Sequence, residues 1–249
     1  LFLLYVLLIV AVVQWLGHAR ATSWDETLWV VIHPINGDGS ERSAAWIHSL
    51  SVSQFEPIAR FMSEQGHGYG LAIDQPMQIV LGSEVTEQPP APPTSGNPFA
   101  VMLWSLKLRY WTWRVDRGEQ PPPADIEVYV RYFDPEQHGV LGHSLGLRKG
   151  RIGVVNAFAS ADHRGSNQVV IAHEMLHTLG ASDKYDPRSN QPLFPSGYAD
   201  PGAQPTFPQA LAELMGGRIP LSPYESVMPR SLAQVVIGQD TAREIRWLR

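Results

Sequence analysis

Short apolar runs with strand character alternate with segments of helical spacing along most of the chain. Residues 27–33 form an apolar, β-branched run that predicts a buried strand, and Pro34 should end it. Apolar side chains at every second position predict further strands at residues 77–81 and 126–132. Residues 152–159 are so uniformly apolar that we expect a strand covered on both faces.

Helical patterns lie between these strands and beyond them. Apolar residues recur at helical spacing over residues 52–62 and 240–248, and Asn97-Pro98 should open a helix that runs to about residue 114. We expect one apolar face of that helix to pack in the core, formed by Phe99, Met102, Leu103, Leu106, Tyr110 and Trp113. The proline-rich residues 88–98 should form an exposed loop, and residues 139–150 a loop or an irregular edge strand.

The order of these elements predicts the domain organisation. Strands and helices alternate through about residue 180, which favours a mixed α/β layer, and the rest of the chain is rich in proline and glycine. We expect a single domain over residues 22–249, with an N-terminal subdomain to about residue 182 and a C-terminal subdomain over residues 183–249. A chain of this length can form one sizeable core.

The first residues have a different character. Residues 1–16 read LFLLYVLLIVAVVQWL and carry no charge, which is typical of a segment directed to a membrane. We therefore expect residues 1–21 to be a hydrophobic anchor or signal segment, with a single-pass membrane contact through residues 1–17 and the following domain outside the cytoplasm. The alternatives are a signal peptide cleaved near Ala19-Arg20-Ala21, which would give a secreted protein, and a buried core helix.

Composition excludes several functions. The net charge is -5 and no run of lysine or arginine is present, so we expect no nucleic-acid partner. The chain has no cysteine, which excludes disulfides, thiolate metal sites and a cysteine nucleophile. Any metal must therefore be held by histidine, aspartate or glutamate.

One predicted helix carries candidate chemistry. Residues 165–167 should cap it, and a mainly apolar pattern continues to Leu179. His173 and His177 are four residues apart, so both imidazoles lie on one face of the helix and can reach one ion. Glu174 is offset around the helix, where its carboxylate can meet a water molecule rather than the ion.

The residues that follow this helix supply a third ligand. Gly180 is suited to a left-handed helix terminus, which would turn the chain and bring Asp183 back to the imidazoles. Two imidazoles and one carboxylate leave a fourth tetrahedral position open, as in catalytic zinc sites. Asp186 is a second candidate carboxylate, and Tyr185 is a candidate for stabilising an oxyanion.

The segment HEMLHTLGASD, residues 173–183, resembles the long zinc motif of the metzincin peptidases, in the HExxHxxGxxD form of the snapalysin-like enzymes. This resemblance implies an α+β fold with a twisted mixed sheet, an antiparallel edge strand along the substrate cleft, a zinc helix and a small loop-rich C-terminal subdomain. It also implies a methionine-containing turn beneath the metal, for which residues 224–229 with Met228 are the candidate. The alternative is that Met228 is an ordinary core residue.

These residues predict a zinc-dependent metallopeptidase, an endopeptidase that acts on a peptide or protein substrate. Glu174 would be the general base for a zinc-activated water, with Zn²⁺ held by His173, His177 and Asp183. One alternative is a gluzincin-type peptidase whose third ligand is Glu213 or Glu225. Another is a membrane-tethered binding or assembly module with a structural zinc, although such a site has no need of a glutamate beside the first histidine.

Overall fold

The fold is that of a computed structural model, which describes residues 20–93, 97–115, 124–142, 144–147 and 151–248 together with Tyr5 and Val12. Its strands are β1 (Leu28–Asn36), β2 (Met77–Leu81), β3 (Ile126–Phe133), β4 (Leu145–Leu147), β5 (Ile152–Phe158), β6 (Ala212–Glu213), β7 (Ile219–Pro220), β8 (Ser226–Val227) and β9 (Val235–Val236). Its α-helices are α2 (Glu41–His48), α3 (Glu56–Gly68), α4 (Pro98–Val115), α5 (Arg164–Leu179) and α6 (Gln239–Glu244). Single 3-10 turns occur at η1 (Val52–Gln54), η2 (Ala161–His163) and η3 (Leu232–Gln234).

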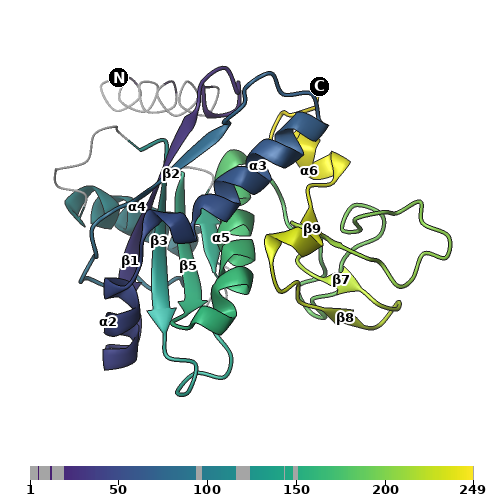
Figure 1. The fold of residues 1–249 in the computed structure, drawn as a ribbon. Coiled ribbons are helices and arrows are strands. Elements are labelled where there is room, and N and C mark those ends of the chain that lie inside the picture. The colour runs from purple at the N-terminus through teal and green to yellow at the C-terminus, as the bar shows by residue number, and fades with distance from the viewer. Residues whose placement is uncertain are drawn as a thin grey trace.

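A five-stranded sheet forms the centre of the molecule, with strand order β2-β1-β3-β5-β4 (Figure 1). The first four strands are parallel, and β4 pairs antiparallel with β5 at the edge. Crossover connections between parallel strands place helices on the faces of the sheet, so both faces of a parallel sheet are usually covered. Helices α3 and α5 pack on one face and α4 packs on the other. The predicted mixed α/β layer with an antiparallel edge strand is confirmed.

The chain beyond α5 shares the core of the sheet. It contains two two-stranded sheets, β6 with β9 and β7 with β8, and the short helix α6, joined mainly by loops (Figure 1). Leu214, Met215 and Ile245 are fully buried in the same apolar cluster as the inner face of α5. The C-terminal part is therefore packed directly against the helix that carries the candidate site.

Two N-terminal elements differ from the prediction. Strand β1 continues through Pro34 to Asn36. Pro34 has no backbone N–H to donate, but β2 pairs with β1 only as far as Ile32, so no hydrogen bond between these two strands is lost. Helix α2 was not predicted. Ser40 begins it by accepting a hydrogen bond from the backbone amide of Ser43 at 3.1 Å.

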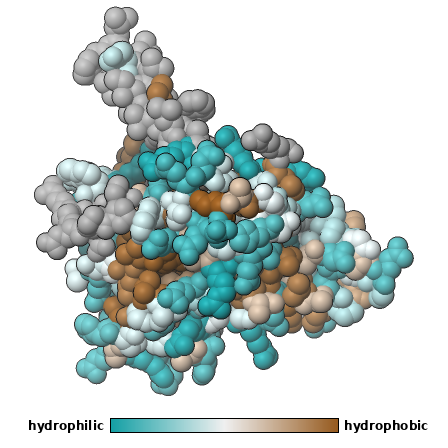
Figure 2. Space-filling model, turned by 45° about the horizontal axis from the view of Figure 1, so that its top comes forward, coloured by the Kyte–Doolittle hydropathy of each residue, from teal (hydrophilic) through white to brown (hydrophobic). Residues whose placement is uncertain are grey.

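The prediction for α4 was wrong about which face is buried. The structure places Trp104, Leu108 and Trp111 against the sheet. The predicted face is between 54% and 76% exposed, and it consists of Phe99, Met102, Leu103, Leu106, Tyr110 and Trp113. Apolar residues surround this helix on all sides, so their spacing could not identify the inner face. Hydrophobic side chains also form separate patches in the mainly hydrophilic surface that Figure 2 shows.

The structure also corrects the expected membrane anchor. In the part of the chain that it describes, no helix is long and apolar enough to cross a membrane. Even α4, with 18 residues, contains three basic side chains. The predicted anchor, residues 1–17, lies outside the described residues except for Tyr5 and Val12. From Ala21 onward the chain belongs to the packed domain, because Ala21 is fully buried and the Trp24 indole donates to the Ile245 carbonyl at 2.8 Å.

Candidate metal centre

Helix α5 carries the candidate site and is fixed at its start by Asn167. The helix begins at Arg164, directly after η2. The prediction that residues 165–167 cap it was therefore wrong, because they lie inside the helix. Asn167 bonds instead to the end of β5, where its amide group donates to the Phe158 carbonyl at 2.8 Å and accepts from the Phe158 amide at 3.1 Å. These two bonds set the position of the helix relative to the sheet.

Helix α5 ends in the predicted left-handed turn. Gly180 has a φ of 114°, and the amides of Gly180 and Ala181 both donate to the carbonyl of Leu176. A side chain with a Cβ atom is strained in this conformation, which explains why glycine stands here. The turn reverses the chain and brings Asp183 back over the exposed face of His173 and His177.

Three donor atoms meet at this point. The distance from Asp183 Oδ1 to His173 Nε2 is 3.1 Å, and its distance to His177 Nε2 is also 3.1 Å. The two Nε2 atoms are themselves 3.1 Å apart. The structure thus brings together the three residues predicted as ligands.

The other ring nitrogen of each histidine faces a backbone carbonyl. His173 Nδ1 lies 2.9 Å from the Leu214 oxygen, and His177 Nδ1 lies 2.8 Å from the Ala181 oxygen. A carbonyl only accepts hydrogen bonds, so each Nδ1 must carry a proton. In the neutral rings both Nε2 lone pairs then point toward the carboxylate of Asp183 and toward each other. This arrangement of acceptors is favourable only if a cation or a proton lies among them.

The donor set fits zinc. A triangle with sides of 3.1 Å has its centre about 1.8 Å from each corner, so an ion just outside this plane can make the roughly 2.0–2.1 Å bonds typical of zinc. The side chains of His173 and His177 are mostly buried, at 12% and 16% exposure, whereas Asp183 is 44% exposed. The two imidazoles are therefore held inside the protein, and the triad is open to solvent on the side of Asp183.

The electrostatics favour positive charge at the same place. Burial lowers the pKa of His177, but the hydrogen bond to Asp183 and the negative charge of Glu174 outweigh it, and the pKa is raised. Burial raises the pKa of Asp183, but the two imidazoles outweigh it and hold the pKa well below its ordinary range. Burial, the Asp183 charge and the hydrogen bond to Asp183 raise the pKa of Tyr185 to about 12.

Comparison with protein-family models and with curated proteins gives no match. The case for a metal therefore depends on the donor set. Among the described residues, His173, His177 and Asp183 are the group of three or more possible ligands whose donor atoms all lie within 4.8 Å of one another.

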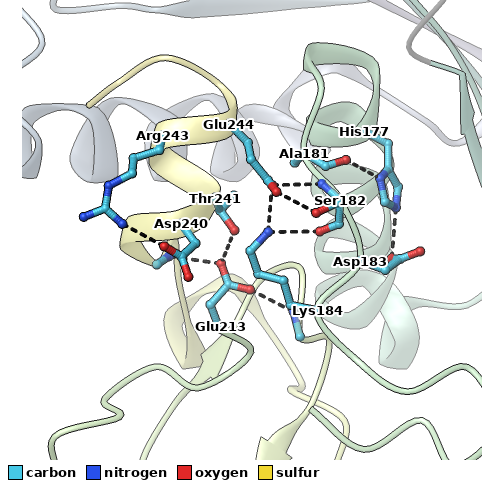
Figure 3. A network of polar contacts seen from close by, with 12 residues as sticks. His177, Ala181, Ser182, Asp183, Lys184, Glu213, Asp240, Thr241, Arg243 and Glu244 are labelled. Carbon is cyan, nitrogen blue, oxygen red and sulfur yellow. Dashed lines mark hydrogen bonds and ion pairs between the residues drawn. The ribbon is translucent and has the colours of Figure 1, made fainter. Parts of the chain in front are cut away.

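The competing carboxylates lie elsewhere. Glu213 is fully buried and accepts hydrogen bonds from the Gly216 amide at 2.8 Å and from the Thr241 hydroxyl at 2.7 Å. Figure 3 shows it directed toward α6, away from Asp183. Asp186 closes a local turn by accepting from the Arg188 amide at 2.9 Å. Glu225 is exposed beside β8 and, like Glu213 and Asp186, does not belong to the group of possible metal ligands among the described residues.

A cleft of about 530 Å³ opens beside the triad and is lined by His173, Glu174 and Tyr185. Glu174 is only 6% exposed. Strand β4 lies directly over this part of α5, because a Cβ atom on Gly146 would be 2.5 Å from His177 Cβ and 2.6 Å from the Glu174 carbonyl oxygen. Strand β4 and helix α5 are thus in close contact beside the cleft.

The methionine predicted beneath the metal is not buried. Met228 lines the cleft and is 45% exposed. Met215 is instead fully buried, and it follows Leu214, whose carbonyl orients His173. Sequence reasoning missed this segment, although an apolar pair followed by Gly216-Gly217 is a signal for a buried turn.

Proposed function

We propose that this protein is a zinc-dependent peptidase of the metzincin type, in which His173, His177 and Asp183 hold the ion. The observation that supports this proposal is the triangle of three donor atoms 3.1 Å apart, with both Nδ1 atoms facing backbone carbonyls. The antiparallel edge strand beside the metal helix and the left-handed turn before Asp183 agree with the same type.

When bound, zinc lowers the pKa of a water molecule toward about 7 and polarises the carbonyl of the scissile peptide. Glu174 accepts the proton of the attacking water and passes it to the amine nitrogen that leaves. Its burial at 6% exposure keeps bulk water away from this transfer. A structural zinc site has no use for such a carboxylate, which argues against the alternative of a non-catalytic binding module.

We propose that Tyr185 assists the reaction. Its ring centroid lies 6.3 Å from that of His173, and the residue lines the same cleft. The phenol is protonated at neutral pH, as tyrosine ordinarily is, so its hydroxyl is a hydrogen-bond donor. We assign it the stabilisation of the negative charge that develops on the substrate oxygen.

The substrate is an extended peptide. Strand β4 pairs only with β5 among the described residues, so its other edge can accept a further strand. The cleft beside it has a mixed lining, and its apolar part, which suits side chains of such a peptide, includes Val140, Leu141, Phe158, Val170 and Leu214. Main-chain hydrogen bonds to β4 would hold the peptide, and this lining would select its side chains.

The test compares Glu174→Gln with the unchanged chain. The variant should bind one zinc ion, measured by metal analysis, and should lose hydrolysis of an unstructured protein such as casein, because only the proton acceptor is removed. Glu64→Gln, on the exposed side of α3, is the matched control and should keep both properties. Near-normal hydrolysis in the Glu174 variant would exclude this mechanism, and zinc binding without hydrolysis in the unchanged chain would favour the structural module.

A further inference from the structure

The residues on either side of Asp183 are both bound by one carboxylate of α6. The Glu244 side chain accepts from the Ser182 amide at 2.9 Å, from the Ser182 hydroxyl at 2.6 Å and from the Lys184 ammonium at 2.7 Å. The Lys184 ammonium also donates to the Ser182 carbonyl at 3.1 Å. Figure 3 shows that these contacts join Glu244, Ser182 and Lys184 in a ring on one side of the segment, while Asp183 points to the other side, toward His177.

The ammonium group in this ring is protected from water, whereas Ser182 is exposed. The Lys184 side chain is 4% exposed and the Glu244 side chain 32% exposed. A buried ammonium group is unfavourable unless it is paired, so Lys184 must remain with Glu244. The Lys184 backbone is fixed as well, because its amide donates to the Met215 carbonyl at 2.9 Å and its carbonyl accepts from the Leu193 amide at 2.8 Å.

Helix α6 is itself firmly held, so it can serve as a support. The Thr241 hydroxyl and the Gly238 amide donate to the buried carboxylate of Glu213 at 2.7 Å and 3.0 Å. At the other end of the helix, the Ile245 carbonyl accepts from the Trp24 indole at 2.8 Å. Glu244 therefore projects from a fixed backbone toward the chain around Asp183.

We propose that Glu244 is the positioning residue of the third metal ligand. By binding Ser182 and Lys184 it restricts the backbone of Asp183, so that Oδ1 stays 3.1 Å from both imidazoles. Without Glu244 the segment after Gly180 has more conformational freedom, and metal binding has to restrict it. The inference deepens the proposed function, because the ion that Asp183 would hold is the one assigned there.

The test is the zinc affinity of Glu244→Gln in the full chain, measured by competition with a chromophoric chelator. Loss of an outer partner of a metal ligand typically weakens binding by about 10–100-fold, so we expect a loss of at least about tenfold. Asp240→Asn is the matched control, since Asp240 lies on the same helix and pairs with Arg243 at 2.7 Å without reaching the Asp183 segment. Its zinc affinity should be unchanged.

Two further variants separate positioning from folding. Ser182→Ala removes one 2.6 Å bond from an exposed side chain and should weaken zinc binding less than Glu244→Gln does, with the fold intact. Glu244→Gln combined with Lys184→Met removes the buried charge that Glu244 pairs, and should recover thermal stability while zinc affinity stays low. The absorption spectrum of bound Co²⁺ should change in the Glu244 variants and stay unchanged in Asp240→Asn.

Zinc affinity in Glu244→Gln equal to that of the unchanged chain, with or without a loss of thermal stability, would overturn the positioning role and leave the proposed function standing. Recovery of zinc affinity together with stability in the double variant would also overturn it. If the unchanged chain binds no zinc in the same titration, the proposed function fails and the positioning role fails with it.

Discussion

Replacing Gly146 by alanine should push β4 away from helix α5. The added Cβ would lie 2.5 Å from His177 Cβ and 2.6 Å from the Glu174 carbonyl oxygen, whereas ordinary contact begins at 3.4 Å. One element must therefore move by about 0.8–0.9 Å, and inserting a methyl group into such a contact costs about 1–3 kcal/mol. Helix α5 is buried on its inner face, so we expect the short edge strand to move.

For a chain of about this length, each kcal/mol lowers the melting temperature by roughly 2–4 °C, so Gly146→Ala should melt about 2–12 °C below the unchanged chain. Thermal denaturation followed by circular dichroism measures this shift. Zinc affinity should change little because neither α5, which carries His173 and His177, nor the turn that carries Asp183 has to move, while KM for a peptide should rise as the edge of β4 is displaced.

Two neighbouring glycines provide controls, because alanine also lowers the backbone entropy of the unfolded chain wherever it replaces glycine. A Cβ on Gly139 would meet nothing within 4 Å, and one on Gly142 would meet only the Asn156 side chain at 3.8 Å. Both alanine variants should be as stable as the unchanged chain, or slightly more stable. If Gly146→Ala melts at the same temperature as Gly139→Ala, then β4 and α5 are not in the close contact described above.

Two other predictions concern the ligands. Asp183→Ala should weaken zinc binding by at least about tenfold, whereas Asp186→Ala should leave it unchanged, and a zinc titration of both decides between them; unchanged affinity in the Asp183 variant would remove it from the ligand set. The stability of the metal-free protein should depend on pH. The pKa of His177 is raised, so its contribution to stability is complete below the ordinary value of 6.5 and is lost as the pH rises. The pKa of Asp183 is lowered, so its contribution is complete above 3.8 and is lost as the pH falls. Zinc competes with the proton that His177 binds, so added zinc should raise the melting temperature more at about pH 8 than at about pH 5.5. An equal rise at both pH values would contradict this account.

Local rules were sufficient for the part of the site that lies within a few residues. The four-residue spacing of His173 and His177 and the glycine at position 180 predict the geometry of the triad, because helix period and left-handed termini depend on the local chain. Two central strands were predictable for a similar reason: β5 from an apolar run that reflects burial on both faces, and β3 from apolar residues at every second position.

Contacts between distant segments were not predictable. Nothing near Leu214 marks its carbonyl as the partner of His173, and nothing near Glu244 marks it as the partner of Ser182, because such pairs depend on how the chain packs. The inner face of α4 was missed because leucine, methionine and tryptophan surround that helix, and only the shape of the sheet selects Trp104 and Trp111.

The two histidines take their orientation from parts of the chain that are made at different times. The carbonyl that orients His177 follows it by 4 residues, whereas the one that orients His173 follows by 41, and Glu244 lies 62 residues beyond Ser182. Synthesis proceeds from the N-terminus, so the carbonyl that faces His177 is made well before the one that faces His173. If the triad holds zinc as proposed, a chain still on the ribosome would carry all three ligands before the segments that support them have been made.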